Sequence, residues 1–161
     1  IKDRDRKKLF HIIVSDIEMA ARYVHISDFS KKLFARFLPG PITFLLPQKT
    51  GALPHDLTHG SELVGIRIPN YPSLTKLVQA FGKPVTATSA NITGEPDIYN
   101  PKEIDATYDH RKPAPDLVLD AGILAHVEPS TMIAVGADNS LSLVRQGPIS
   151  FEQVQKFAHT I

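Results

Sequence analysis

The stretch that decides the fold of this chain is KPVTATSAN, residues 83–91. Its first half, up to Thr86, is apolar and β-branched around one proline, which predicts a buried strand. Its second half carries only short hydroxyl and amide side chains, which leave room for a ligand and offer it hydrogen bonds. Open α/β folds bind their ligands at strand ends. The stretch therefore predicts either a site at Thr88, Ser89 and Asn91 or an ordinary polar turn after a strand.

Length and composition predict one soluble globular domain. A chain of 161 residues, 42% hydrophobic and 22% charged, has an ordinary composition for that class. The chain has no cysteine, which excludes disulfides, thiolate metal sites and cysteine nucleophiles. Because it also has no membrane-length apolar run and no secretory signal, we expect a cytoplasmic protein without membrane contact. A net charge of +1 gives no overall attraction for nucleic acid.

Hydrophobic periodicity predicts strands and helices that alternate along most of the chain. We expect strands over residues 9–14, 42–46, 63–68, 84–88, 117–119, 131–135 and 141–144. We expect helices over residues 16–22, 28–37, 74–81, 101–106 and 151–159, with Ser15, Ser27 and Ser150 as N-caps. Residues 48–61 read as a polar loop. Several C-terminal strands lack helical crossovers, so the pattern indicates a single α/β domain with a twisted mixed sheet flanked by helices.

Cations and hydroxyl groups recur at other strand ends. Arg67 interrupts an apolar strand, so it either faces solvent or has an anionic partner. Ser130 opens one predicted strand and Arg145 closes another. Together these groups predict a site for phosphates or carboxylates. The basic residues 2–8 are either a solvated face or a phosphate contact.

Several common catalytic and binding motifs are absent from the sequence. It contains no P-loop, no dinucleotide-binding fingerprint and no Gly-x-Ser-x-Gly nucleophile elbow. Its seven histidines are scattered and have no metal-ligand spacing. We therefore predict no metal site built from protein side chains and no hydrolase triad.

Six motifs occur in the order and spacing of the YrdC-like family. They are LPGPIT (38–43), GIRIPNYP (65–72), TSANITG (88–94), DAG (120–122), ST (130–131) and RQG (145–147). Because they span nearly the whole chain, the sequence resembles the L-threonylcarbamoyladenylate synthases of that family. These nucleotidyltransferases join L-threonine, bicarbonate and ATP into threonylcarbamoyl-AMP and release pyrophosphate. The threonylcarbamoyl-AMP serves the threonylcarbamoyladenosine modification of tRNA. The resemblance implies a YrdC-like fold over residues 1–161.

The resemblance also implies residues for the nucleotide. The family pairs Lys-x-Arg with Ser-x-Asn, which correspond here to Lys2, Arg4, Ser89 and Asn91. Lys2 and Arg4 would be the catalytic cations that, with Mg²⁺, neutralise phosphate charge as pyrophosphate leaves. Ser89, Asn91 and Arg145 would bind ATP.

On the threonine side, the resemblance implies that Arg67, Thr88 and Ser130 bind the substrate. No covalent nucleophile is expected, because the threonine amine attacks the bicarbonate-derived carbon and the carbamate oxygen then attacks the α-phosphate. The product would pass to downstream threonylcarbamoyl transferase machinery.

The chain departs from the family pattern at its start and in its fifth motif. The family's Pro-Thr-Glu-Thr-x-Tyr-Gly-Leu segment would precede Ile1, so we expect the YrdC-like domain in residues 1–161 to be N-terminally incomplete. The usual Ser-Thr-Val-Val-Asp reads STMIA at residues 130–134 and loses the acid. One alternative is a double-stranded RNA- or tRNA-binding module without synthase activity. The basic residues 2–8 could contribute to such RNA binding. A carbamoyltransferase-type relative is another, but such relatives carry cysteines that this chain lacks.

Overall fold

The structure is a computed structural model, and it describes residues 11–161. These residues form two compact units. The sheet unit comprises residues 11–87 and 128–161, and the loop unit comprises Thr88–Val127. None of the helices in the described part of the chain has the length and apolar character that crossing a membrane requires.

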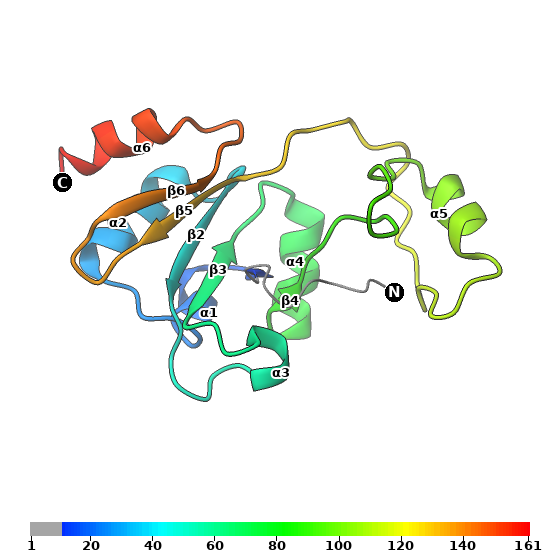
Figure 1. The fold of residues 1–161 in the computed structure, drawn as a ribbon, viewed down its shortest axis with the longest axis horizontal. Coiled ribbons are helices and arrows are strands. Elements are labelled where there is room, and N and C mark those ends of the chain that lie inside the picture. The colour runs from blue at the N-terminus through cyan, green and yellow to red at the C-terminus, as the bar shows by residue number, and fades with distance from the viewer. Residues whose placement is uncertain (1–10) are drawn as a thin grey trace. The chain divides into compact units, whose positions relative to one another are not determined.

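The sheet unit contains one six-stranded mixed sheet (Figure 1). Its strands are β1 (His11–Ile13), β2 (Ile42–Pro47), β3 (Leu63–Arg67), β4 (Val85–Thr86), β5 (Thr131–Val135) and β6 (Leu141–Arg145). They lie in the order β4-β1-β3-β2-β5-β6. The pairs β1/β3 and β2/β5 are parallel, and the other neighbours are antiparallel. This arrangement confirms the predicted α/β class with a mixed sheet flanked by helices.

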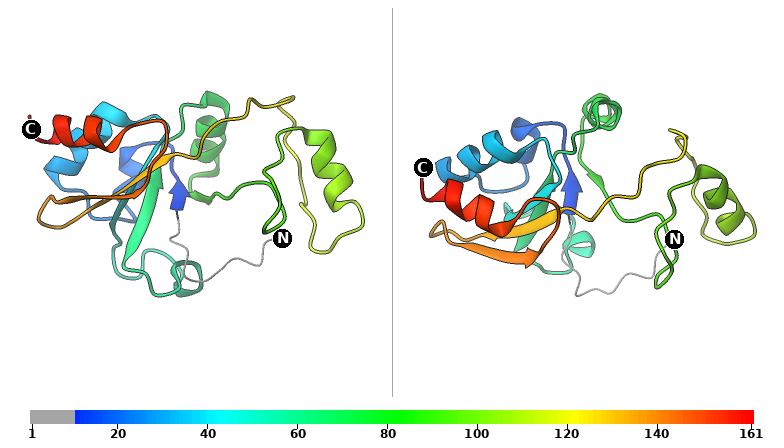
Figure 2. Two further views of the ribbon diagram at one scale, coloured as in Figure 1. Left: turned by 45° about the horizontal axis from the view of Figure 1, so that its top comes forward. Right: turned by 90° about the horizontal axis from the view of Figure 1, so that it is seen from above.

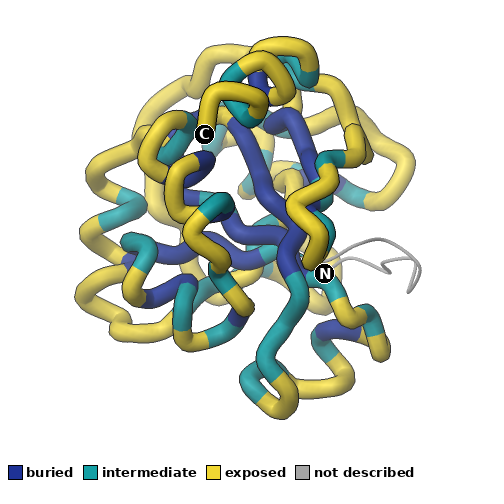
Figure 3. Tube along the Cα trace, turned by 90° about the vertical axis from the view of Figure 1, so that its left-hand side faces the viewer, coloured by how far each residue is buried: buried dark blue, intermediate teal, exposed yellow. Residues whose placement is uncertain are grey.

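Helix α2 (Asp28–Phe37) covers one face of the sheet, and α6 (Phe151–Ala158) packs beside it (Figure 2). The ring of Phe34 stacks on Phe44 of β2 with centroids 5.4 Å apart. Phe37 meets Phe157 edge to face at 5.6 Å, which joins the two helices. Strands β2, β3 and β5 are mostly buried, whereas β6 is mostly exposed (Figure 3).

The helix caps confirm two predictions and correct a third. Ser27 and Ser150 accept the first-turn N–H groups of α2 and α6, as predicted, and Ser150 forms a capping box with Gln153. The prediction of Ser15 as a cap is wrong by one residue. Asp16 caps α1 (Ile17–Ala20) by accepting from Met19 N, and Ser15 donates to the Asp16 carboxylate instead. A carboxylate competes well for this position because it can accept from both groups at once.

Two predictions for the middle of the sheet unit need correction. The predicted polar loop 48–61 contains a short helix, α3 (His55–Thr58). The predicted buried strand 84–88 forms only the two-residue β4, where Val85 is half-buried and Thr86 is exposed. Strand β4 is an edge strand that pairs with β1 alone, and an edge strand leaves one side open to solvent. Helix α4 (Pro72–Phe81) precedes it and ends at Gly82, whose φ of 73° suits glycine.

The loop unit has one helix, α5 (Pro101–Tyr108), and is otherwise irregular. Asn100 caps α5 by accepting a hydrogen bond from Lys102 N at Oδ1, over 3.1 Å. The helix starts at the predicted residue and ends two residues later than predicted. The predicted strand 117–119 is wrong, because these residues form no ladder and Leu117 is 75% exposed. A short run of apolar residues forms a strand only where a neighbouring strand pairs with it.

Candidate functional site

The predicted site residues of the sheet unit lie on the face that α2 does not cover. Successive residues of a strand point to opposite faces, and Phe44 stacks on α2, so Thr43 points to the other face. Phe44 pairs with Ile66, so the next pair along the antiparallel ladder is Thr43 with Arg67. The register continues from Thr43 to Met132 of β5 and on to Arg145 of β6. The sheet thus aligns two arginines with a buried threonine between them.

Ser130, at the start of β5, is held by hydrogen bonds from two directions. Its Oγ lies 2.8 Å from Thr43 Oγ1. Arg145 Nε and Nη2 donate to the Ser130 carbonyl oxygen at 3.0 and 2.8 Å, and Nη2 also reaches Ser130 Oγ at 3.2 Å. Thr43 and Ser130 are both buried. We name Thr43, Arg67, Ser130 and Arg145 the hydroxyl–arginine cluster.

Arg67 is the cation in this cluster whose buried Nε has no hydrogen-bond partner among the described residues. The residue as a whole is half-buried. Burial, and then the positive charge of Arg145, lower the pKa of Arg67 below its ordinary value. A buried cation beside a second cation is costly unless an anion joins it. The arrangement therefore fits a carboxylate or phosphate ligand, and Arg67 is half-buried rather than fully exposed to solvent.

Arg145 has a double role in the cluster. It is an exposed residue, but its guanidinium is partly desolvated where it lies on Ser130, and this burial lowers its pKa. Its Nη1 carries two further N–H donors for a ligand. The side chain therefore can orient Ser130 and contact an anion at the same time.

The chain after β6 returns close to Ser130 and holds it in place. A Cβ on Gly147 would overlap the backbone at Pro129 and Thr131 and would lie 2.8 Å from the Ser130 carbonyl carbon. Thr131 Oγ1 donates to the Ile149 carbonyl at 2.6 Å and accepts from Ile149 N at 3.1 Å. Only glycine permits this close approach at position 147.

The loop unit contains the second predicted group, held by local bonds. Ser89 Oγ donates to Asn91 Oδ1 at 2.9 Å, and Asn91 Nδ2 donates to the Glu95 carbonyl. Asn91 is 8% exposed, whereas Thr88 and Ser89 are exposed. The turn reverses at Gly94, which has a φ of 92°. These bonds present the Ser89 hydroxyl beside the Asn91 amide.

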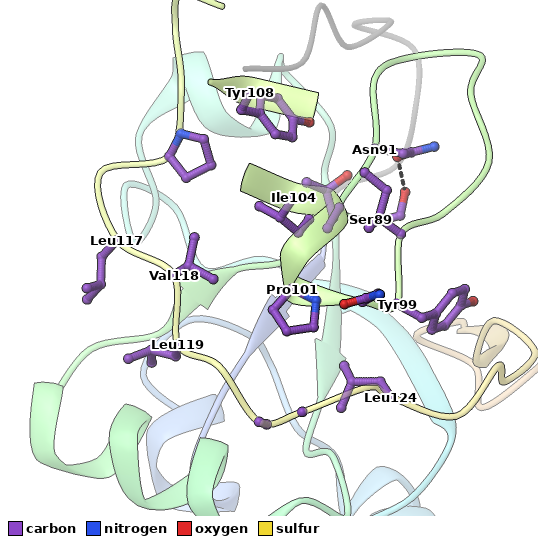
Figure 4. A pocket seen from close by; sticks show the side chains of 17 residues that line it. Ser89, Asn91, Tyr99, Pro101, Ile104, Tyr108, Leu117, Val118, Leu119 and Leu124 are labelled. Carbon is purple, nitrogen blue, oxygen red and sulfur yellow. Dashed lines mark hydrogen bonds between the residues drawn. The ribbon is translucent and has the colours of Figure 1, made fainter. Parts of the chain in front are cut away.

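A cavity of about 500 Å³ lies within the loop unit. Ser89 and Asn91 lie on one side of it, and Leu117, Val118 and Leu119 lie on the other (Figure 4). Helix α5 adds apolar side chains to the lining, and Thr88 is also part of it. The cavity has the mostly apolar lining with a few polar groups that is typical of small-molecule sites.

The structure thus gathers the predicted residues in two groups. The sheet unit brings together Arg67, Ser130 and Arg145, and the loop unit brings together Thr88, Ser89 and Asn91. The remaining two predicted cations, Lys2 and Arg4, lie outside the described residues.

Sequence reasoning missed two residues of this site, Thr43 and Gly147. A polar residue inside the apolar run ITFLL was the available signal for Thr43, and its position within the LPGPIT motif was a second. For Gly147 the available signal was its position within the RQG motif, but nothing local marks it as a point of close approach, because its neighbours at residues 129–131 are distant in sequence. Within residues 11–161, no group of three or more His, Asp or Glu side chains is arranged to hold a metal ion.

By sequence and structure, the chain is similar to proteins named threonylcarbamoyl-AMP synthase and Sua5. The Sua5/YciO/YrdC family model, described as "Telomere recombination", matches residues 1–147. A Methanocaldococcus jannaschii protein is 33% identical over 156 residues, which are 97% of this chain and 70% of that protein. The threonylcarbamoyl-AMP synthase of Bacillus subtilis is 33% identical over 145 residues, 82% of this chain and 41% of that protein.

A solved structure shares the fold. The crystal structure of P. abyssi Sua5 complexed with L-threonine superimposes with a TM-score of 0.81 at 26% identity, over 95% of this chain and 44% of that one. The chain thus spans less than half the length of both the Bacillus synthase and P. abyssi Sua5.

Proposed function

Because this chain belongs to the Sua5/YciO/YrdC family, we propose that it is the catalytic domain of an L-threonylcarbamoyladenylate synthase. Such an enzyme forms threonylcarbamoyl-AMP and pyrophosphate from L-threonine, bicarbonate and ATP for tRNA modification. We take residues 1–161 as one YrdC-like domain of that enzyme. The observation that carries the proposal is the hydroxyl–arginine cluster, since it offers an amino-acid carboxylate oriented hydroxyls and an arginine whose buried Nε has no acceptor within residues 11–161.

We assign the threonine carboxylate to Arg67 and Ser130. A guanidinium binds a carboxylate with charge-assisted hydrogen bonds, and the partly buried position strengthens them. The carboxylate would also offset the two effects that lower the pKa of Arg67, which are its burial and then the positive charge of Arg145. Thr88 is a further candidate for the threonine side.

We assign the nucleotide to Ser89, Asn91 and Arg145, with Lys2 and Arg4 as the catalytic cations. Hydroxyl, amide and guanidinium donors suit phosphate oxygens. Mg²⁺ enters this scheme with ATP as part of the substrate, because the described residues offer no carboxylate cluster to hold it. Magnesium that is bound mainly through phosphates and water is usual in such chemistry.

The reaction then needs positioning more than covalent help from the protein. The threonine nitrogen attacks the bicarbonate carbon, water leaves, and a carbamate forms. A carbamate oxygen attacks the α-phosphorus of ATP, and the bond to pyrophosphate breaks. Arg67 and Ser130 hold the first nucleophile in place, and the phosphate-side cations stabilise the charge that develops on the leaving group.

The test uses the full-length protein with L-threonine, ¹³C-bicarbonate and MgATP. We expect threonine-dependent pyrophosphate release together with labelled threonylcarbamoyl-AMP by mass spectrometry. A reaction without threonine is the control. If no nucleotide-dependent product forms and the protein binds double-stranded RNA with steep salt dependence, the RNA-binding alternative replaces the proposal.

A further inference from the structure

Thr43 has a buried hydroxyl that no catalytic step in the proposed reaction uses. The residue is 0% exposed and lies in β2 among fully buried apolar neighbours. The hydrogen bond described for its hydroxyl joins Thr43 Oγ1 to Ser130 Oγ at 2.8 Å, across 87 positions of sequence. A valine of nearly the same shape would fill the space without any polar group to satisfy. The hydroxyl therefore acts on Ser130.

The hydrogen-bonding capacity of Ser130 limits how this pair can be arranged. Its Oγ has one proton and two lone pairs. Arg145 Nη2 can only donate, so its contact at 3.2 Å occupies one lone pair. The Ser130 proton then either points to Thr43 or, if Thr43 donates to the second lone pair, is released for another acceptor.

An anion on this face of the sheet selects between the two arrangements. A carboxylate oxygen near Ser130 is repelled by a lone pair and attracted by an O–H. With the anion bound, the favoured chain runs from Thr43 O–H to Ser130 Oγ and from Ser130 O–H to the anion. Successive bonds in such a chain polarise and strengthen one another.

We infer that Thr43 is a positioning residue, which donates to Ser130 Oγ and thereby directs the Ser130 proton to the carboxylate of the bound amino acid. The inference rests on the proposed function for the identity of that carboxylate. Thr43 is not expected to touch the substrate. It acts through Ser130, and its removal would weaken amino-acid binding without altering the nucleotide side.

The experiment compares Thr43→Val and Thr43→Ser in the full-length protein by steady-state kinetics. For Thr43→Val we expect the KM for threonine to rise about fivefold, the effect of one lost hydrogen bond, with the KM for ATP unchanged. Thr43→Ser restores the hydroxyl and should return the threonine KM to within about twofold of wild type. Thr58→Val is the matched control, because Thr58 is also buried but its hydroxyl donates to the His55 carbonyl within its own helix.

A double variant shows whether Thr43 acts through Ser130. If it does, adding Thr43→Val to Ser130→Ala changes the threonine KM no further. An unchanged KM in Thr43→Val, equal rises for threonine and ATP, or additive effects in the double variant would each overturn the inference. A wild-type protein that makes no threonylcarbamoyl-AMP would instead refute the proposed function, and calorimetric titration of threonine into wild type and Thr43→Val would still test the role of Thr43.

Discussion

The sheet unit and the loop unit hold their polar groups in different ways. In the sheet unit, Thr43 and Ser130 lie 87 positions apart in sequence and are joined by strand register and a buried hydrogen bond. In the loop unit, Ser89 and Asn91 lie two positions apart and are joined within one turn. The first arrangement depends on the whole sheet and the second on a local loop.

The two units also differ in apolar burial. Phe44 and Ile66 of the sheet unit are 0% exposed, whereas Leu117 and Ile123 of the loop unit are 75% and 78% exposed. Burial of apolar surface is the main favourable contribution to folding. We therefore expect substitutions in the sheet unit to change both stability and activity, and those in the loop unit to change activity with little effect on stability.

The largest effect should come from Arg67→Met, which separates stability from activity within the sheet unit itself. Loss of a charged hydrogen-bond donor should lower threonine-dependent kcat/KM about 100-fold. The melting temperature should stay constant or rise, because folding no longer desolvates a cation whose Nε has no acceptor within residues 11–161. Kinetics and thermal unfolding measure the two effects, with the exposed Arg36→Met as control. A lower melting temperature with unchanged kinetics would show that Arg67 is structural.

Gly147→Ala should lower both the stability of the sheet unit and the activity of the protein. The added Cβ would overlap the backbone at Pro129 and Thr131, so Ser130 must shift. We expect the free energy of unfolding to fall by about 1–3 kcal/mol, as for other overpacked sites. Denaturant unfolding measures the stability, and the threonine KM should rise in the same variant. A variant with wild-type stability would mean that the loop after β6 moves freely away from Ser130.

Ser89→Ala tests the loop unit. It should lower activity by less than Arg67→Met does, and it should leave stability unchanged. The variant removes the donor to Asn91 Oδ1 and a candidate phosphate ligand, so we expect the KM for ATP to rise about tenfold. The melting temperature should stay at the wild-type value because Ser89 is exposed. Ser142→Ala, at an exposed position of β6, is the matched control. A rise in the threonine KM with no change for ATP would reassign Ser89 to the other substrate.

The smallest effect should come from Asp16→Ala, which removes the cap of α1. We expect a loss of about 1 kcal/mol in the free energy of unfolding at pH 7, with unchanged kinetics. The hydrogen bond from Ser15, and then that from Met19 N, lower the pKa of Asp16 below its ordinary 3.8. A lowered folded-state pKa stabilises the fold above the unfolded value, and this contribution is lost as the pH falls through the folded value.

Unfolding of both proteins as a function of pH therefore checks the role of Asp16. The difference between wild type and Asp16→Ala should shrink as the pH falls below 3.8. Ser15 is the cap that the sequence predicted. Ser15→Ala should lower the free energy of unfolding at pH 7 by less than Asp16→Ala does, because the hydrogen bond from Met19 N to Asp16 remains. Equal losses in the two variants would show that the two side chains act as one capping unit.

Local signals explain which elements could be predicted from sequence. Helix α2 begins after Ser27 and ends at Phe37, and β5 spans Thr131–Val135, both as expected. Their caps and periodicity lie within the element itself. The strand predicted at 117–119 has the right composition but forms no ladder in the loop unit, and the one at 84–88 shortens at the sheet edge. A strand depends on its neighbours, which composition does not identify.

The sequence by itself determined the α/β class and most helix boundaries, because caps and periodicity act over a few residues, and it supplied the residue types from which an anion site was predicted. It left open whether Arg67 faced solvent or a ligand. Only the tertiary structure decided that Arg67 is half-buried near Arg145, and that Thr43 and Gly147 lie against Ser130. The physical reason is strand register, which brings residues that are distant in sequence onto one face of the sheet.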